Sequence, residues 1–424
     1  GIEDFQVRVG INTGLVVLGG MTEGEDTIMG STVNLAARME SSAPPGNLLI
    51  SHNTFQHIRG LFDVEPLEPI NVKGFDEPVA VYIVRRVKPR ANRKLVRGLA
   101  GIQTDLFGRA AELQFLKDIY TAAQDQGNGR LVTIIGEAGI GKTRLLTEFL
   151  HWIGNTNPST TVFFGQSSLE KQSTAYGVLR DLFVSHFQDI EAAGSTSAKA
   201  DIETGFRQIF GFDRSGEMRS HIIGQLLGFD FSSSVHVKGL LGDAQQLRNR
   251  ALNYLVEYFQ ATSQRFPTLL VLEDIHWADD SSLEIIADIG PEVLRHPLVI
   301  LCLTRERFFE RRPAWGEGRE DHAQLRLSPL AEDQSRSFVE QILHRVEDLP
   351  HDLRELIIQR SDGNPYYIEE LIRMLISGGA INSSSENWVI EPEKLAQVEI
   401  PTTLMGVLQS RLESVPPAEK ITLQ

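Results

Sequence analysis

The sequence has one cysteine among its 424 residues, Cys302, so no internal disulfide can form. It lacks any apolar run near the ~20 residues that a membrane-spanning helix needs, and no signal-peptide pattern is visible. Basic residues are outnumbered by acidic ones, and the formal charge of −15 disfavours broad nucleic-acid binding. We therefore expect a cytoplasmic protein with neither a membrane nor a nucleic acid as partner.

The most informative segment is the run GEAGIGKT at residues 136–143. A β-branched apolar run precedes it and a helical pattern follows, which is the context of a phosphate-binding loop. Gly136, Gly139 and Gly141 would let the backbone N–H groups surround a triphosphate, with the helix dipole directed at the same oxygens. Lys142 would reach the β- and γ-phosphates, and the Thr143 hydroxyl would ligate Mg²⁺. The alternative is a glycine-rich turn with a solvated lysine.

Residues 268–279, TLLVLEDIHWAD, supply the acidic groups that such a loop requires. Four apolar residues lead directly into Glu273 and Asp274, which is costly unless the carboxylates face a cation. Glu273 would hold Mg²⁺ and Asp274 would activate water, although the pattern leaves open which acid has which role. Two acids that merely cap a strand are the alternative. His276 and Trp277 fit packing roles, and Cys302 fits a buried, unreactive thiol.

Apolar strand patterns at 131–135, 161–165, 268–272, 298–304 and 325–328 alternate with helical ones, which predicts an α/β fold with a parallel sheet. About 100 residues separate the second and third strands, so we expect an inserted helical subdomain. The pattern after Pro329 is wholly helical. We divide the chain into 1–84, a basic linker 85–104, a nucleotide-binding domain 105–330, a helical lid 331–398, and the start of a winged-helix or helical domain at 399–424. The linker is either solvated or docked on an acidic surface.

Five motifs occur in order: FGR at 107–109, GEAGIGKT, LLVLEDIHWAD, LCLTR at 301–305 and GNPYYIEE at 363–370. Together they resemble the AAA-related signal-transduction ATPases, or STAND NTPases, over about residues 104–424. The resemblance implies that Gly108 and Arg109 line the adenine side and that Arg305 senses the γ-phosphate. It also implies that Pro365 meets the base from the lid, and that the module can oligomerise.

Residues 1–84 carry a second resemblance, through VGINTG at 9–14, GSTVNLAARME at 30–40 and NVKG at 71–74. They look like the C-terminal half of a class III nucleotidyl cyclase, a partial α+β domain. Asn34 and Arg38 lie four residues apart and so share one helix face, where they could orient ribose and stabilise charge on an α-phosphate. Lys73 could bind the triphosphate as a point charge.

Base selection departs from many adenylyl cyclases, which carry an aspartate seven residues before that asparagine. Thr27 occupies the position here, as in the subtype that includes soluble, bicarbonate-responsive adenylyl cyclases. Its hydroxyl both donates and accepts, so it tolerates adenine but specifies it less firmly than a carboxylate. A one-residue slip would make Asp26 the recognising acid instead.

The sequence begins in a strand pattern and ends in a helical one, so we expect a piece of a longer protein. In the cyclase family, two metal-binding aspartates lie in the N-terminal half of the domain, which we place before Gly1. We therefore expect this chain to bind ATP but to make no cyclic nucleotide by itself. The parent would be an adenylyl cyclase that works with a dimer partner and is regulated by its ATPase. The alternatives are a regulatory scaffold with a degenerate cyclase-like sensor, and a transcription regulator.

Overall fold

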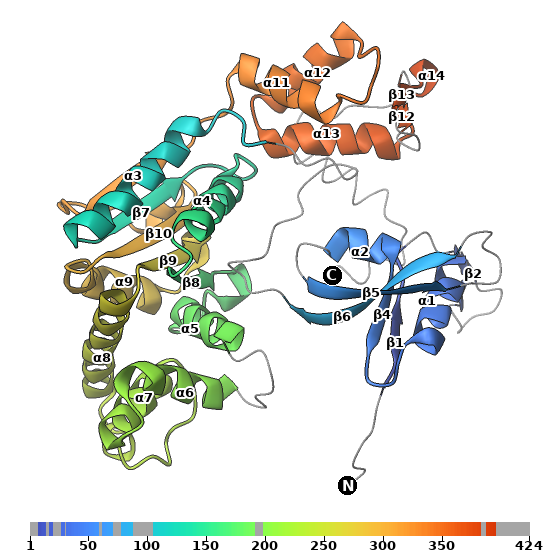
Figure 1. Ribbon diagram of the computed structural model, residues 1–424. Helices are drawn as coiled ribbons and strands as arrows, with labels where there is room; N and C mark the ends of the chain where they lie inside the picture. Colours follow the sequence, from blue (N-terminus) through green and yellow to red (C-terminus); the bar gives the residue numbers. More distant parts are fainter. Residues whose placement is uncertain are drawn as a thin grey trace. The chain divides into compact units, whose positions relative to one another are not determined.

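The computed structural model describes residues 7–13, 17–19, 27–29, 31–58, 62–70, 78–87, 105–190, 198–382 and 387–395 (Figure 1). Contacts within the chain divide it into two compact units. The first comprises Gly1–Thr104, Glu340–Leu353 and Glu369–Gln424, and the second comprises Asp105–Val339 and Arg354–Ile368.

A four-stranded sheet in the order β1-β4-β6-β5 organises the front of the first unit. Its strands are β1 (Val9–Ile11), β4 (Leu48–Ser51), β5 (Phe62–Ile70) and β6 (Val79–Val87). β1 is parallel to β4, whereas β4–β6 and β5–β6 are antiparallel. A separate pair joins β2 (Val17–Gly19) to β3 (Thr27–Met29).

Helix α1 (Ser31–Ser42) packs on this sheet, and α2 (His52–Ile58) follows β4. Leu35 and Met39 of α1 are buried against Leu49 and Val81, because a spacing of four residues repeats on one helix face. Helix α1 lies so close to strand β1 at Gly10 that a Cβ atom added there would be 2.2 Å from the backbone nitrogen of Glu40.

Strand β6 runs three residues beyond the expected domain end at residue 84, through Arg85 and Arg86. Arg85 is bound in the sheet, where its guanidinium donates to the carboxylate of Glu65 and the side chain of Asn47. These two arginines therefore belong to the first unit and not to the expected linker. Residues 88–104 lie outside the described residues, as does the expected further domain at 399–424.

The second unit contains a five-stranded, wholly parallel sheet in the order β11-β7-β10-β9-β8, which confirms the expected α/β fold. The strands are β7 (Arg130–Ile135), β8 (Thr161–Gln166), β9 (Thr268–Glu273), β10 (Leu298–Thr304) and β11 (His322–Arg326). β10 matches its predicted bounds, whereas β11 begins three residues earlier than expected.

Helices cover both faces of this sheet. Leu269 and Val271 of β9 join a core with α3 (Ala110–Gln126) and α4 (Lys142–Thr156), while Leu270 and Leu272 face the opposite core. The opposite core is built by α5 (Gly177–Ile190), α8 (Ala244–Arg265) and α9 (Asp280–Val293). The continuous apolar runs in the sequence follow from this double burial.

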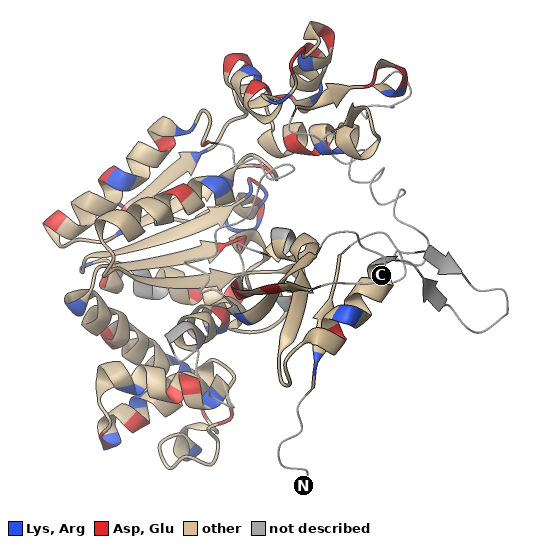
Figure 2. Cartoon of the chain, turned by 45° about the vertical axis from the view of Figure 1, so that its right-hand side comes forward, with Lys and Arg blue, Asp and Glu red and all other residues tan. Residues whose placement is uncertain are grey.

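The expected helical insertion lies between β8 and β9. It consists of α5, α6 (Ala198–Phe210), α7 (Arg214–Leu226) and α8, with short 3₁₀ turns η2 (Leu169–Lys171) and η3 (Lys238–Leu240). Asp213 and Asp243 cap α7 and α8 by accepting backbone N–H bonds. Figure 2 shows basic and acidic residues interleaved along these helices.

The segment after Pro329 begins with the expected helices: α11 (Glu332–Ile342), α12 (His351–Ser361) and α13 (Pro365–Ser377). The expectation that it is wholly helical is wrong, because β12 (Ile381–Asn382) pairs antiparallel with β13 (Val389–Ile390) before α14 (Pro392–Leu395). None of the helices in the described ranges is long and apolar enough to cross a membrane.

Candidate functional site

The glycine-rich loop joins β7 to α4 in the second unit, as its sequence predicts. Gly139 and Gly141 have φ angles of 81° and 102°, a region that side chains with a Cβ rarely adopt. The Lys142 ammonium folds back over the loop and donates to the carbonyl oxygens of Gly136 at 2.6 Å and Glu137 at 3.0 Å. Thr143 follows it in the first turn of α4.

Sheet order brings the other expected residues to the same edge. β10 lies between β7 and β9, and the Gly136 amide donates to the Thr304 carbonyl oxygen at 3.2 Å. Arg305 therefore leaves β10 beside the loop, and Glu273 and Asp274 leave β9 one strand further on.

The same side chains influence the pKa of Lys142. Burial lowers the pKa of Lys142, the Asp274 carboxylate opposes this shift most strongly, and Arg305 adds to it. Glu137 and Glu273 also favour the charged ammonium. A buried lysine among these charges is suited to an anion that carries its own cation.

The two adjacent acids differ in their surroundings. Glu273 is the last residue of β9 and is buried, whereas 39% of the Asp274 side chain is exposed. Asp274 has φ 55° and ψ 40°, a left-handed conformation that costs on the order of 1–3 kcal/mol in a residue other than glycine. Such strain persists only where the surroundings hold it, and it is frequent at functional sites.

His276 lies in the 3₁₀ turn η4 (Ile275–Trp277), directly after the acids. Its ring is buried, and neither ring nitrogen has a hydrogen-bond partner among the described residues. Burial, followed by the charges of Arg305, Arg307 and Lys142, lowers the pKa of His276 to about 3. The imidazole is therefore neutral near pH 7. Trp277 is covered by the Arg307 guanidinium, 3.8 Å from the ring centroid.

Arg109, expected on the adenine side, is buried and bonded to backbone. Its guanidinium donates to the carbonyl oxygens of Ile140 at 3.2 Å and Ser328 at 2.5 Å. The side chain thus ties the phosphate-binding loop to the segment after β11. Gly108 has a φ of 61°, and a Cβ atom there would lie 2.3 Å from the Gln334 side chain.

Residues 363–366 lie against the phosphate-binding loop, which places Pro365, the first residue of α13, next to it. The Asn364 side chain donates to the Ala138 carbonyl oxygen at 2.9 Å, and the Tyr366 amide donates to Gly139 at 3.3 Å. The lid motif therefore contacts the phosphate-binding loop, while the expected contact of Pro365 with the base stays a prediction.

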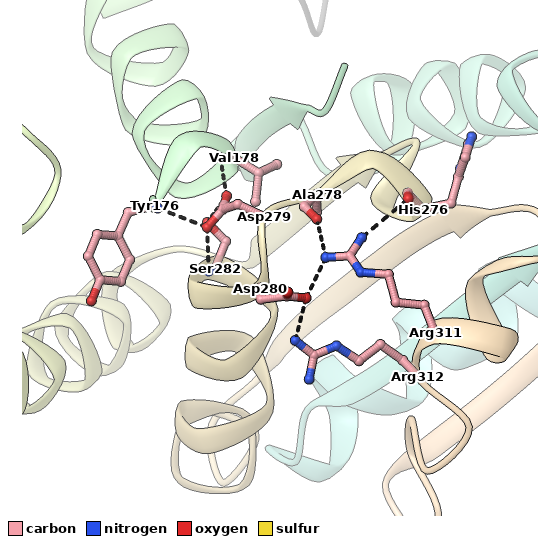
Figure 3. Close-up of polar contacts among 9 residues, drawn as sticks. All are labelled: Tyr176, Val178, His276, Ala278, Asp279, Asp280, Ser282, Arg311 and Arg312. Atoms are coloured by element: carbon pink, nitrogen blue, oxygen red, sulfur yellow. Dashed lines mark hydrogen bonds and ion pairs between the residues drawn. The ribbon is translucent and has the colours of Figure 1, made fainter. Parts of the chain in front are cut away.

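Asp279 has a structural role that sequence reasoning missed. Its buried carboxylate accepts the backbone N–H groups of Tyr176 at 2.8 Å, Val178 at 3.3 Å and Ser282 at 2.8 Å, together with the Ser282 hydroxyl at 2.7 Å (Figure 3). One carboxylate therefore caps the starts of both α5 and α9. Tyr176 has a φ of 60°, so the capped turn is also strained.

In the front segment, α1 places Asn34 and Arg38 on one exposed face, as their spacing predicts. Thr27 lies in β3, but its side chain is outside the described part of the chain. Lys73 and Asp26 also lie outside the described residues. The structure thus brings the expected helical pair together and leaves the lysine and the base-recognising position untested.

The donor set near Lys142 suits a hard cation. The Thr143 hydroxyl and the two carboxylates offer only oxygen ligands, which Mg²⁺ prefers. Within the described ranges, no group of three or more His, Cys, Asp or Glu residues could hold a metal. Mg²⁺ commonly needs only one or two carboxylates and takes its other ligands from phosphates and water, so the residues present fit it.

Comparison with protein families identifies two domains. Residues 1–86 match the adenylate and guanylate cyclase catalytic domain, and residues 105–301 match the AAA ATPase domain.

Individual relatives match over different lengths. An uncharacterised protein of Rhizobium meliloti (strain 1021) is 26% identical over 432 residues, which is 99% of this chain and 39% of that protein. A receptor-type adenylate cyclase of Trypanosoma brucei brucei is 32% identical over 152 residues, covering 29% of this chain and 26% of that protein. The chain thus spans well under half the length of either relative.

Among solved structures, the adenylyl cyclase CyaB from P. aeruginosa is 40% identical over 17% of this chain and 37% of its own, with a TM-score of 0.16. The Aeropyrum pernix ORC1 protein in complex with DNA is 16% identical over 70% of this chain and 66% of its own, with a TM-score of 0.41. The family matches and the parallel sheet lead to one conclusion: the chain joins cyclase catalytic-domain sequence to an AAA ATPase domain.

Proposed function

We propose that the AAA ATPase domain binds ATP with Mg²⁺ and acts as a STAND-type regulatory switch for a signalling cyclase. One observation carries the proposal: the buried Lys142 ammonium shares its surroundings with Asp274, Glu273 and Arg305 at the edge of the parallel sheet. A phosphate chain with a bound cation would satisfy all of these charges.

In this proposal each residue has a defined role. Lys142 leaves its two carbonyl partners to bind the phosphates, and Arg305 contacts the γ-phosphate. Thr143, Glu273 and Asp274 would hold Mg²⁺, which neutralises phosphate charge when bound. Glu273 is assigned as the main cation ligand, and Asp274, the more exposed acid, would both contact the cation and orient the attacking water.

In this proposal the lid would respond to the binding of a nucleotide at the phosphate-binding loop. Arg109 holds the loop in place, and residues around Pro365 bind the loop from the lid. A nucleotide that repositions the loop would therefore act directly on α13. This connection is how binding would change the lid or promote oligomerisation.

The test is calorimetric titration of ATP into the Lys142→Ala variant. We expect binding to be lost while the circular dichroism spectrum is unchanged. The matched control is Lys238→Ala, which removes an exposed lysine of η3 in the helical insertion and should bind as the unmodified chain does. Unaltered affinity in Lys142→Ala would contradict the proposal.

For the whole protein, we propose conversion of ATP to cyclic AMP and pyrophosphate. Asn34 would orient the ribose and Arg38 would stabilise the α-phosphate, while Lys73 would bind the triphosphate and Thr27 would accept adenine. The exposure of Asn34 and Arg38 on one face of α1 supports a site completed by a dimer partner. A guanylyl cyclase domain of the RhoGC fusion protein from Blastocladiella emersonii is described as dimeric.

The second candidate is a scaffold in which the cyclase domain is a degenerate sensor. Both cyclic AMP and cyclic GMP should be measured with the full-length protein and with its Arg38→Ala variant. Loss of cyclic AMP in the variant, with ATP hydrolysis retained, would support catalysis. Absence of both cyclic nucleotides in the unmodified protein would favour the scaffold.

A further inference from the structure

Arg311, at the end of the short helix α10 (Phe308–Arg311), makes contacts that the roles above do not use. Its guanidinium donates to the carbonyl oxygens of Ala278 at 2.7 Å and His276 at 3.4 Å, and to the Asp280 carboxylate at 2.5 Å (Figure 3). The first two acceptors belong to the turn that follows the acidic end of β9. One side chain therefore connects the segment after β10 to the segment after β9.

Arg312, the next residue, provides an internal comparison. It also donates to the Asp280 carboxylate, at 2.6 Å, and both arginine side chains are 28% exposed. Within the described part of the chain, Arg311 donates to the backbone of the turn and Arg312 does not. The two residues thus share a charge, an ion-pair partner and an exposure, and they differ in contact with the turn.

The turn that Arg311 holds fixes the backbone of Asp274. The Trp277 amide donates to the Asp274 carbonyl oxygen at 2.8 Å, so the turn closes directly on this residue. Asp274 is in the left-handed region, which it keeps only if its neighbours hold it there. Asp279 fixes the other end of the turn against the start of α5.

We propose that Arg311 is a positioning residue for the acidic strand end. By binding the carbonyl oxygens of His276 and Ala278, it holds the turn that keeps the Asp274 carboxylate directed toward the cation beside Lys142. Its hydrogen bonds among the described residues go to His276, Ala278 and Asp280 and not to the phosphate-binding loop. This inference rests on the proposed binding of ATP with Mg²⁺.

The experiment compares ATP affinity in Mg²⁺ with ATP affinity in EDTA, by calorimetry on the purified chain. Arg311→Met keeps the aliphatic stem and removes the guanidinium. We expect the ATP affinity of this variant in EDTA to match that of the unmodified chain. The Mg²⁺ gain, defined as the factor by which Mg²⁺ raises ATP affinity over that in EDTA, should fall by on the order of tenfold, as for residues that orient metal ligands. Arg312→Met should keep the full gain.

Hydrogen exchange supplies a readout that does not depend on nucleotide. The amides of Trp277 and Ala278 close the turn. They should exchange faster in Arg311→Met than in the unmodified chain, and at an unchanged rate in Arg312→Met. Should Arg311→Met fail to fold, Arg311→Lys retains a positive charge near Asp280. It should show a smaller loss of the Mg²⁺ gain.

Several results would overturn the inference. An undiminished Mg²⁺ gain in Arg311→Met would do so, and an equal loss in both variants would assign the effect to the Asp280 ion pair instead. ATP binding by the unmodified chain without any Mg²⁺ gain would also reject it while leaving nucleotide binding intact. Failure of the unmodified chain to bind ATP at all would reject the proposed function itself.

Discussion

The side-chain amide of Asn364 donates to the carbonyl oxygen of Ala138 at 2.9 Å, across 226 positions of sequence. Its carbonyl oxygen accepts the Tyr367 amide at 3.2 Å, within the first turn of α13. One side chain therefore joins the start of a lid helix to the phosphate-binding loop. The Tyr366 amide adds a second bond, to Gly139.

This junction predicts unequal effects of two similar substitutions, Gly139→Ala and Gly141→Ala. Both glycines have positive φ, so each alanine pays strain on the order of 1–2 kcal/mol. At Gly139 a Cβ atom would also lie 2.6 Å from the Asn364 side-chain oxygen, whereas at Gly141 it would meet nothing within 4 Å. Thermal unfolding without nucleotide should show the lower midpoint for Gly139→Ala. Equal midpoints would show that the Asn364 side chain moves away from the added Cβ atom without destabilising the fold.

The acid pair gives a prediction that separates cation binding from hydrolysis. Glu273→Gln should weaken ATP binding in Mg²⁺ but not in EDTA, because an amide binds the cation poorly. Asp274→Asn should keep ATP binding in EDTA and lose part of the affinity gained from Mg²⁺, while hydrolysis falls by on the order of 10²-fold or more, as expected for a group that also orients water. Calorimetry and phosphate release measure the two effects. The opposite pattern would exchange the two assignments.

Much of the second unit could be predicted from local sequence. The run 298–303 is apolar throughout because β10 is buried on both faces. The glycine and lysine spacing of the loop 136–143 is found in few structures other than phosphate-binding loops. Asn34 and Arg38 could be paired because helical periodicity alone places them together.

The remaining features depend on contacts distant in sequence. Asp279 resembles an ordinary helix cap, and only the fold brings Tyr176 and Val178 to it from about 100 positions away. Arg311 looks like one of several surface arginines until α10 is placed beside the turn after β9. The two-residue strands β12 and β13 are too short for a periodic signal.

The lone thiol gives a prediction about reactivity. Cys302 lies in the middle of β10 with no exposed surface, and burial raises the pKa of its thiol to about 12. The reactive thiolate is therefore scarce up to pH 9, and reagents cannot reach it. Iodoacetamide should leave the native chain unmodified at pH 7 and pH 9 and should label it fully in denaturant, as read by mass spectrometry. Rapid labelling of the native chain would contradict this packing.

The double cap at Asp279 predicts a large cost for a nearly isosteric change. In Asp279→Asn one acceptor oxygen becomes an NH₂ donor that faces N–H groups, so at least one buried bond is replaced by a repulsive contact. Because two helix starts also lose a stabilising negative charge, we expect the free energy of unfolding to fall by about 2–4 kcal/mol. Asp280→Asn is the matched control, since that carboxylate is 63% exposed and pairs with Arg311 and Arg312. Its cost should stay below about 1 kcal/mol. Urea unfolding followed by circular dichroism measures both, and a smaller loss for Asp279→Asn than for Asp280→Asn would show that α5 and α9 are held by other contacts.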